Sequence, residues 1–209
     1  MLNKLSHLRI PTSIALSFIS VIFIGSLLLS LPFVQTPGSD AAYIDHLFIS
    51  VSATCVTGLF TESIADSYNI FGKIIVLTMI QIGALGLMTF YGLFMIFLHK
   101  NIPYRQKQAM TSSVNYDSIG SSTSFILRIV QYTLIIEAAG ALILSFHFIP
   151  EKGLLDGLGT SIFLAVSAFC NAGFDPFGNI SLIPYAGNQL INLTIAALII
   201  LGGIGFGIW

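Results

Sequence analysis

Charge is what this sequence has least of. Only 8% of its 209 residues are charged, whereas 55% are hydrophobic. A soluble domain carries roughly 25% charged residues, so a chain of this composition cannot cover its own surface in water. The 8 basic and 9 acidic residues nearly cancel, which excludes the basic footprint of a nucleic-acid-binding protein. The composition indicates an integral membrane protein whose surroundings are the lipid bilayer.

Cysteine and catalytic groups are also scarce. Two cysteines exclude a disulfide scaffold, and no Cys/His cluster has the spacing of a zinc site. The sequence contains no Ser/His/Asp arrangement and no paired carboxylates of the kind that support catalysis. We therefore expect neither an enzyme nor a cofactor.

Long apolar stretches take the place of charge. A spanning helix needs about 20 apolar residues, because each residue rises about 1.5 Å across a core about 30 Å thick. The first stretch is longer than the roughly 7–15 apolar residues of a signal peptide, and no small-residue cleavage site follows it. The sequence predicts four spans, at Ile14–Val34, Ile74–Leu98, Ile129–Ile149 and Leu190–Trp209.

The basic residues lie on one side of these spans. Six of the 8 precede the first span or lie between the second and third. Cytoplasmic segments carry an excess of Lys and Arg, so we expect a multi-pass protein of the plasma membrane with a cytoplasmic N-terminus. The six are Lys4, Arg9, Lys100, Arg105, Lys107 and Arg128.

The two outer connections each contain an apolar helix too short to cross. Tyr43–Thr54 has Ser39 and Asp40 before it as cap candidates, and Gly157–Phe169 follows Asp156. Apolar segments of this length are candidates for re-entrant elements. The alternative is two short interfacial helices with surface turns.

A repeat argues against that alternative. Ser50–Phe60 aligns with Ala165–Asp175 at an offset of 115 without gaps, and Gln81–Gly86 aligns with Ile200–Gly205 at an offset of 119. The identical pairs in the first alignment are Val51/Val166, Ser52/Ser167, Ala53/Ala168, Cys55/Cys170 and Gly58/Gly173. The chain therefore reads as residues 1–98, a cytoplasmic linker at 99–124, and a second copy at 125–209.

Both copies start and end in the cytoplasm on this interpretation, so they are parallel repeats rather than the inverted repeats of many carriers. The expected fold is an all-α integral membrane protein with two repeats of span, pore helix, filter loop and span. Helix C-termini carry about half a negative charge, and backbone carbonyls can replace the hydration shell of an alkali ion. No carboxylate occurs in either loop before Asp175, which favours a monovalent cation.

The loops TCVTGL (54–59) and FCNAGF (169–174) resemble the filter loops of the Trk/Ktr/HKT superfamily of potassium transporters. QIGALGLMTF (81–90) and LGGIGF (201–206), in the helices that follow, also fit that family. The likeness is closest to the bacterial Ktr/Trk potassium-translocating membrane subunit. It covers the first two of the four repeats that such subunits carry.

The resemblance implies K⁺ uptake through a pore like that of a potassium channel, with K⁺ held by backbone carbonyls. It also implies a homodimer and a cytoplasmic nucleotide-binding regulatory subunit. The implied filter residues are Val56, Thr57, Gly58, Asn171, Ala172 and Gly173. The possible flanking residues are Thr54, Cys55, Leu59, Cys170 and Phe174.

Two repeats cannot close a fourfold pore, so we expect a translocating subunit or a fragment of one. The alternatives are a non-conducting structural or regulatory half-chain that needs two more repeats, and two such chains pairing to supply four walls. Among single residues, Glu137 is interpreted as structural and Cys55 and Cys170 as small hydrophobic residues. The glycines after each loop, Gly83 and Gly202 among them, are interpreted as packing positions rather than hinges.

Overall fold

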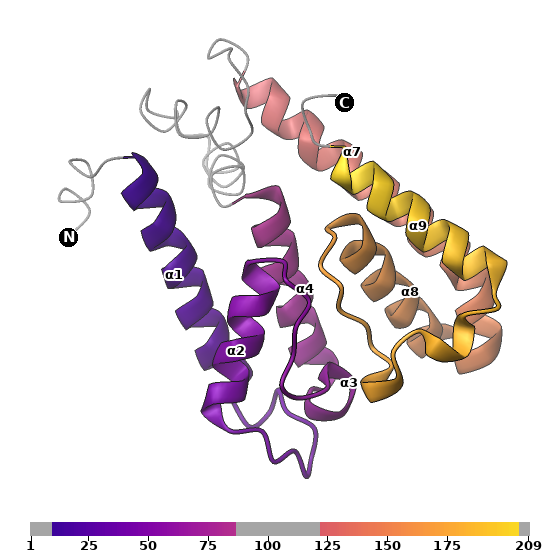
Figure 1. Ribbon diagram of the computed structural model, residues 1–209, viewed down its shortest axis with the longest axis horizontal. Helices are drawn as coiled ribbons and strands as arrows, with labels where there is room; N and C mark the ends of the chain where they lie inside the picture. The colour runs from indigo at the N-terminus through magenta and orange to yellow at the C-terminus, as the bar shows by residue number, and fades with distance from the viewer. Residues whose placement is uncertain (1–9, 87–121, 205–209) are drawn as a thin grey trace.

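The computed structural model describes residues 10–86 and 122–204, which fold into helices joined by irregular loops (Figure 1). These two ranges contain no strand beyond an isolated bridge between Gln35 and Tyr68. The expectation of an all-α protein is therefore confirmed for them. The helices are α1 (Ile10–Leu29), α2 (Tyr43–Thr54), α3 (Ile64–Ser67), α4 (Ile70–Leu85), α7 (Ser122–Lys152), α8 (Leu154–Phe169), η2 (Gly178–Ile180), η3 (Ile183–Tyr185) and α9 (Gln189–Gly203).

The long helices form two groups with the same internal contacts. In the first group α1, α2 and α4 pack on one another, and in the second α7, α8 and α9 do so. The groups meet where α4 packs against α8. In both groups the second long helix, α2 or α8, lies beside the other two, and its loop runs back along it (Figure 1).

A close approach at a glycine recurs in both groups. A Cβ on Gly25 of α1 would collide with the Met79 side chain of α4, and a Cβ on Gly140 of α7 would collide with Leu198 of α9. Gly25 and Gly140 are 115 positions apart, and their partners Met79 and Leu198 are 119 apart. These are the two offsets of the sequence alignment. Small residues let apolar helices approach closely, and the two groups use them at matching positions.

The predicted half-length helices are present, but their N-terminal caps differ from expectation. α2 begins at Tyr43, as predicted, yet Ser39 and Asp40 do not cap it. Instead the Asp45 side chain accepts a hydrogen bond from the Ala42 N–H at 2.9 Å. α8 begins at Leu154, so Asp156 lies inside its first turn rather than before it. The positive φ of 86° at Gly153 lets the chain turn directly from α7 into α8.

One described helix is long and apolar enough to cross a membrane, at Leu127–Lys152 of α7. This matches the predicted third span. The apolar helices Ala15–Leu29, Ile70–Leu85 and Gln189–Gly203 are shorter. The predicted ends of the second and fourth spans, at Leu98 and Trp209, lie outside the described residues.

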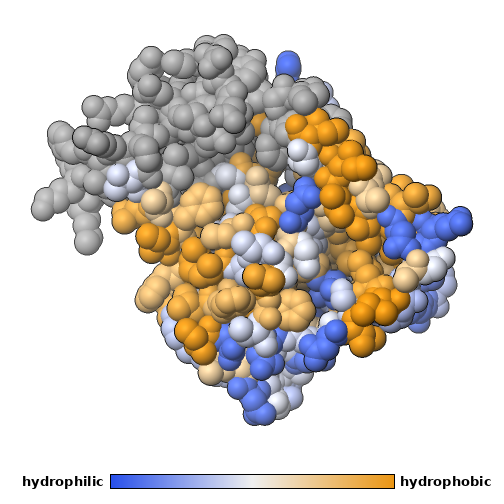
Figure 2. All heavy atoms as spheres, in the orientation of Figure 1, coloured by the Kyte–Doolittle hydropathy of each residue, from blue (hydrophilic) through white to orange (hydrophobic). Residues whose placement is uncertain are grey.

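Large apolar side chains cover the outside of the described helices. Phe23 of α1, Leu142 and Phe146 of α7, and Leu193 of α9 are each more than half exposed. In the face shown in Figure 2, hydrophobic residues spread over the helices, while hydrophilic residues gather at the lower and right-hand edges. Exposed apolar surface on this scale indicates contact with a membrane or with further protein.

A buried polar cluster fixes the N-terminal part of α2. His46 is 2% exposed, and its Nδ1 lies 2.7 Å from the Tyr68 hydroxyl. Its Nε2 lies 3.1 Å from the Gln35 side-chain amide nitrogen. Gln35 and Tyr68 also form the isolated bridge, so His46 connects α2 to both flanking segments. This is a packing role, as buried polar groups with partners usually have.

Candidate functional site

The two loops that follow α2 and α8 end their helices in the same way. The Thr57 N–H donates to the Ser52 carbonyl at 2.9 Å, and the Ala172 N–H donates to the Ser167 carbonyl at 2.8 Å. One residue earlier, the Val56 N–H donates to the Ala53 carbonyl at 3.3 Å. This pair of hydrogen bonds is the Schellman motif, which satisfies the last carbonyls of a helix and reverses the chain.

That motif places an unusual residue in the left-handed region. Val56 and Asn171 occupy the reversal positions, each with a φ of 56°. Asparagine tolerates this conformation, whereas a β-branched residue there is strained. Backbone strain is most often retained where the surrounding structure needs a particular loop shape. The first loop therefore holds its conformation against the preference of its own sequence.

The glycines of the two loops bring the backbones into contact. Gly58 has a φ of 73° and Gly173 a φ of 75°, so each loop has two left-handed residues separated by one other. A Cβ on Gly58 would collide with the Ala172 carbonyl oxygen and would lie 3.0 Å from the Gly173 Cα. The two loops thus meet at Gly58, Ala172 and Gly173, although the two glycines are 115 positions apart in the sequence.

Two serines brace the loops against the helices before them. The Ser52 hydroxyl accepts a hydrogen bond from the Leu59 N–H at 2.9 Å and lies 2.8 Å from the Thr57 hydroxyl. The Ser167 hydroxyl donates to the Phe174 carbonyl at 2.6 Å. Sequence reasoning did not assign these serines a role. Their identity in the repeat alignment was the signal that could have found them.

The helix ends rest on glycines of the next long helix. A Cβ on Gly83 of α4 would collide with the Thr54 carbonyl oxygen, and one on Gly202 of α9 would collide with the Phe169 carbonyl oxygen. These carbonyls belong to the last residues of α2 and α8. The prediction that these two glycines are packing positions is confirmed. Gly86, interpreted in the same way, is instead the C-cap of α4 with a φ of 77°. Gly205 lies outside the described residues.

The two cysteines do not share one environment. Cys55 is exposed, whereas Cys170 is buried. The Cys170 thiol donates to the Gln81 side-chain oxygen at 3.4 Å, and the Gln81 amide donates to both Glu137 oxygens at 3.0 and 3.1 Å. Glu137 is 5% exposed, and it lies between helices, as expected of a structural residue.

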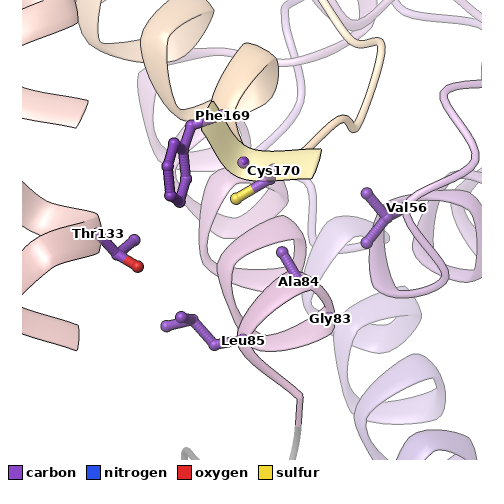
Figure 3. Close-up of a pocket in the computed structure, with 8 residues that line it drawn as sticks. Val56, Gly83, Ala84, Leu85, Thr133, Phe169 and Cys170 are labelled. Atoms are coloured by element: carbon purple, nitrogen blue, oxygen red, sulfur yellow. The ribbon is translucent and has the colours of Figure 1, made fainter. Parts of the chain in front are cut away.

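A cavity of about 280 Å³ lies beside this network (Figure 3). The Cys170 sulfur and the Thr133 hydroxyl both face it (Figure 3). The Thr133 oxygen is buried and has no hydrogen-bond partner, so a water molecule bound in the cavity would satisfy it. The lining residues are Val56, Gly83, Ala84, Leu85, Thr133, Phe169, Cys170 and Gly202.

Acidic side chains do not converge on the loops. Asp175 accepts hydrogen bonds from the Phe177 N–H at 2.9 Å and from the Ser181 hydroxyl at 2.5 Å, so it stabilises its own loop. Among the described residues no group of three or more His, Cys, Asp or Glu side chains is placed to hold a metal ion. The polar groups that the two loops offer are therefore backbone carbonyls, hydroxyls and the Asn171 side-chain amide.

The family model and the curated relatives that match this chain agree on cation transport. The family model described as TrkH, cation transport protein, matches residues 9–209. The potassium/sodium uptake protein NtpJ of Enterococcus hirae is 39% identical, and the Ktr system potassium uptake protein B of Bacillus subtilis is 38% identical. Each of these two alignments covers 94% of this chain and 43% of the relative.

The Ktr system potassium uptake protein B of Vibrio alginolyticus is 32% identical, with 94% of this chain and 42% of the relative aligned. The chain thus spans less than half the length of these curated relatives. The family consists of membrane transporters of cations rather than enzymes, as the sequence indicated. On the strength of a match that extends from residue 9 to residue 209, the chain belongs to the TrkH family of cation transport proteins.

Proposed function

We propose that the chain takes part in potassium uptake across the plasma membrane, and that its two glycine loops form two walls of a K⁺ selectivity filter. The observation that carries the proposal is the contact between the loops at Gly58 and Gly173. Two loops with the same backbone conformation meet there without a side chain between them. A carbonyl-lined conduction pathway needs the backbones of separate loops brought together in this way.

The helices before the loops supply a matching electrostatic environment. α2 and α8 both end at their loops, so the partial negative charge of each helix C-terminus lies beside the contact. That charge favours a cation. The proposed ion ligands are the main-chain oxygens of Val56, Thr57, Gly58, Asn171, Ala172 and Gly173. The proposed flanking residues are Thr54, Cys55, Leu59, Cys170 and Phe174.

The chemistry of the loops favours a monovalent ion. Divalent cations prefer carboxylate ligands, and neither loop contributes one to the contact. Carbonyl oxygens bind an alkali ion strongly enough to replace water and weakly enough to release it. Potassium is named as a substrate of NtpJ and of both Ktr B proteins, and we extend it to this chain.

The arrangement in the membrane follows from the same proposal. Residues 1–98 and 125–209 form two parallel repeats, joined by a cytoplasmic linker at 99–124, and the N-terminus is cytoplasmic. The matching contacts of α1, α2 and α4 with those of α7, α8 and α9 support this division. α7 begins at Ser122, inside the proposed linker. Further units complete the filter, a second copy forms a homodimer, and a nucleotide-binding regulatory subunit binds on the cytoplasmic side.

The proposal is tested with the natural gene expressed whole in a bacterial strain that lacks potassium uptake. Gly58→Val introduces a β-branched residue at a left-handed φ and against the Ala172 carbonyl. We expect it to abolish growth on low potassium and uptake of ⁸⁶Rb⁺. The matched control is Gly159→Ala on α8, where a Cβ meets nothing within 4 Å. Normal uptake by Gly58→Val, at equal protein in the membrane, would exclude the filter assignment.

A further inference from the structure

The buried network behind the second loop connects the two groups of helices. Gln81 belongs to α4 of the first group, whereas Glu137 belongs to α7 and Cys170 follows α8 in the second group. The Gln81 amide reaches both Glu137 oxygens, and the Gln81 oxygen accepts from the Cys170 thiol at 3.4 Å. The Cys170 sulfur also lies 3.8 Å from a Glu137 oxygen. The three side chains form one hydrogen-bonded unit.

This unit acts on the backbone of the second loop at its first residue. Cys170 is the C-cap of α8, and Asn171, Ala172 and Gly173 follow it directly. A displacement of Cys170 therefore moves the Ala172 carbonyl, which faces Gly58. The contact between Gly58 and the Ala172 oxygen has no spare room, so a small displacement changes the spacing between the two loops.

The polar pair is not part of the pattern that the two copies share. At the offsets of 115 and 119, Glu137 and Gln81 correspond to Ile22 and Ile200. The glycine contacts are present in both groups, yet this polar pair occurs only once in the alignment. Burying a carboxyl group is strongly unfavourable unless it has partners. An apolar pair would join α4 and α7 at lower cost.

We propose that Glu137 is a positioning residue that acts through Gln81 and Cys170 to fix the second filter loop, and that it thereby sets the preference for K⁺ over Na⁺. This rests on the proposed function of the loops. The carboxylate accepts both hydrogen bonds from Gln81, and the Gln81 oxygen is then turned toward the Cys170 thiol. Replacing the carboxylate by a group with a single acceptor removes one of the two hydrogen bonds from Gln81, so Gln81 is free to rotate and its contact with Cys170 is weakened.

The test measures ⁸⁶Rb⁺ uptake and its inhibition by Na⁺ in cells that express the natural gene whole. Glu137→Gln offers one acceptor and sets its own amide against that of Gln81. A lost hydrogen bond to a charged group corresponds to roughly a tenfold change in an equilibrium, so we expect about tenfold stronger inhibition by Na⁺. The matched control is Glu151→Gln at the exposed end of the same helix, with inhibition unchanged.

The exchanged pair separates positioning from simple damage. In the double variant Glu137→Gln with Gln81→Glu, the amide at 137 donates to the carboxylate at 81, which still accepts from Cys170. We expect this variant to recover the wild-type preference. Wild-type Na⁺ inhibition in Glu137→Gln, or tenfold stronger inhibition retained in the exchanged pair, would overturn the proposal.

A second pair of variants decides the question if Glu137→Gln does not reach the membrane. Cys170→Ser keeps a donor and Cys170→Ala removes it, while the Gln81–Glu137 pair is untouched. The proposal expects the weaker K⁺ preference only in Cys170→Ala, and equal preference in both variants would refute it. The Gly58→Val variant separates a failure of the proposed filter from a failure of the positioning role of Glu137. If it abolishes uptake while the Glu137 and Cys170 variants retain selectivity, only the positioning role fails.

Discussion

Gly58 lies against the carbonyl of Ala172 so closely that a single added carbon atom has no place between them. The reverse contact is looser, because a Cβ on Gly173 would lie 3.4 Å from the Gly58 Cα, an ordinary van der Waals distance. Both glycines have a left-handed φ. The two loops are therefore alike in conformation but unequal in the room that they leave for a side chain.

This inequality predicts a graded effect of alanine. Gly173→Ala carries only the conformational cost of a left-handed φ, about 1–2 kcal/mol. Gly58→Ala carries that cost and also displaces the second loop. A cost of about 1.4 kcal/mol corresponds to a factor of ten in an equilibrium constant. We therefore expect uptake of ⁸⁶Rb⁺ to fall by about tenfold in Gly173→Ala and to fall below detection in Gly58→Ala. Equal uptake by the two variants would show that the close contact does not limit conduction.

The serine brace predicts a difference between two neighbouring serines of α2. Ser52→Ala removes the acceptor of the Leu59 N–H and the partner of the Thr57 hydroxyl. We expect a loss of about 0.5–1.5 kcal/mol in the free energy of unfolding for each hydrogen bond removed, the usual net contribution of such a bond. The measurement is the loss of monodisperse protein on heating in detergent.

Ser50→Ala is the matched control for that experiment. The Ser50 hydroxyl is buried on the same helix and has no hydrogen-bond partner, so its removal relieves an unsatisfied polar group. We expect thermal stability equal to or above that of the wild type. If Ser50→Ala is as unstable as Ser52→Ala, the effect reflects burial on α2 rather than the brace.

The sequence was sufficient to predict the elements that depend on local pattern. The ends of α2 at Tyr43 and Thr54, and the end of α8 at Phe169, agree with prediction. Apolar length and the glycine after each helix carry this information directly. The alignment of the two copies then correctly indicated which glycines have equivalent contacts, because small residues at helix crossings leave a trace in sequence.

The other features depend on contacts that the sequence pattern does not reveal. The cap of α2 could not be predicted, because Asp45 reaches back to Ala42 from inside the helix while Ser39 and Asp40 offer equally good cap chemistry. The partners of Glu137 could not be predicted either. Gln81 is 56 residues away in sequence, and no periodicity connects α4 with α7. The position of each loop in the membrane is still a prediction.

The reversal position after α8 predicts a preference between two substitutions of Asn171. Asn171→Val places a β-branched residue at a φ of 56° and removes hydrogen bonds to the Phe169 and Ile199 carbonyls. We expect a loss of about 1–2 kcal/mol. Asn171→Gly loses the same hydrogen bonds but adopts this φ freely, so it is expected to be the more stable variant. Thermal unfolding in detergent ranks them, and the opposite order would argue against a left-handed residue at this position.

The close contact between Gly202 of α9 and the end of α8 predicts contrasting effects of alanine at two adjacent positions of α9. A Cβ on Gly202 would collide with the carbonyl of Phe169, the last residue of α8, whereas a Cβ on Gly203 would have its nearest neighbour, the Asn171 amide nitrogen, at 3.9 Å. Overpacking a tight contact costs typically 1–3 kcal/mol. Gly202→Ala is therefore expected to destabilise the protein and to reduce ⁸⁶Rb⁺ uptake, because the end of α8 must move and carries the second loop with it. Gly203→Ala gains helix propensity without a collision and is expected to retain both stability and uptake.

The equivalent change in the first group, Gly83→Ala, collides with the Thr54 carbonyl and is expected to behave like Gly202→Ala. Normal uptake by both Gly83→Ala and Gly202→Ala would mean that the helix ends move freely without altering the pathway, and the loops would then not owe their positions to these two contacts.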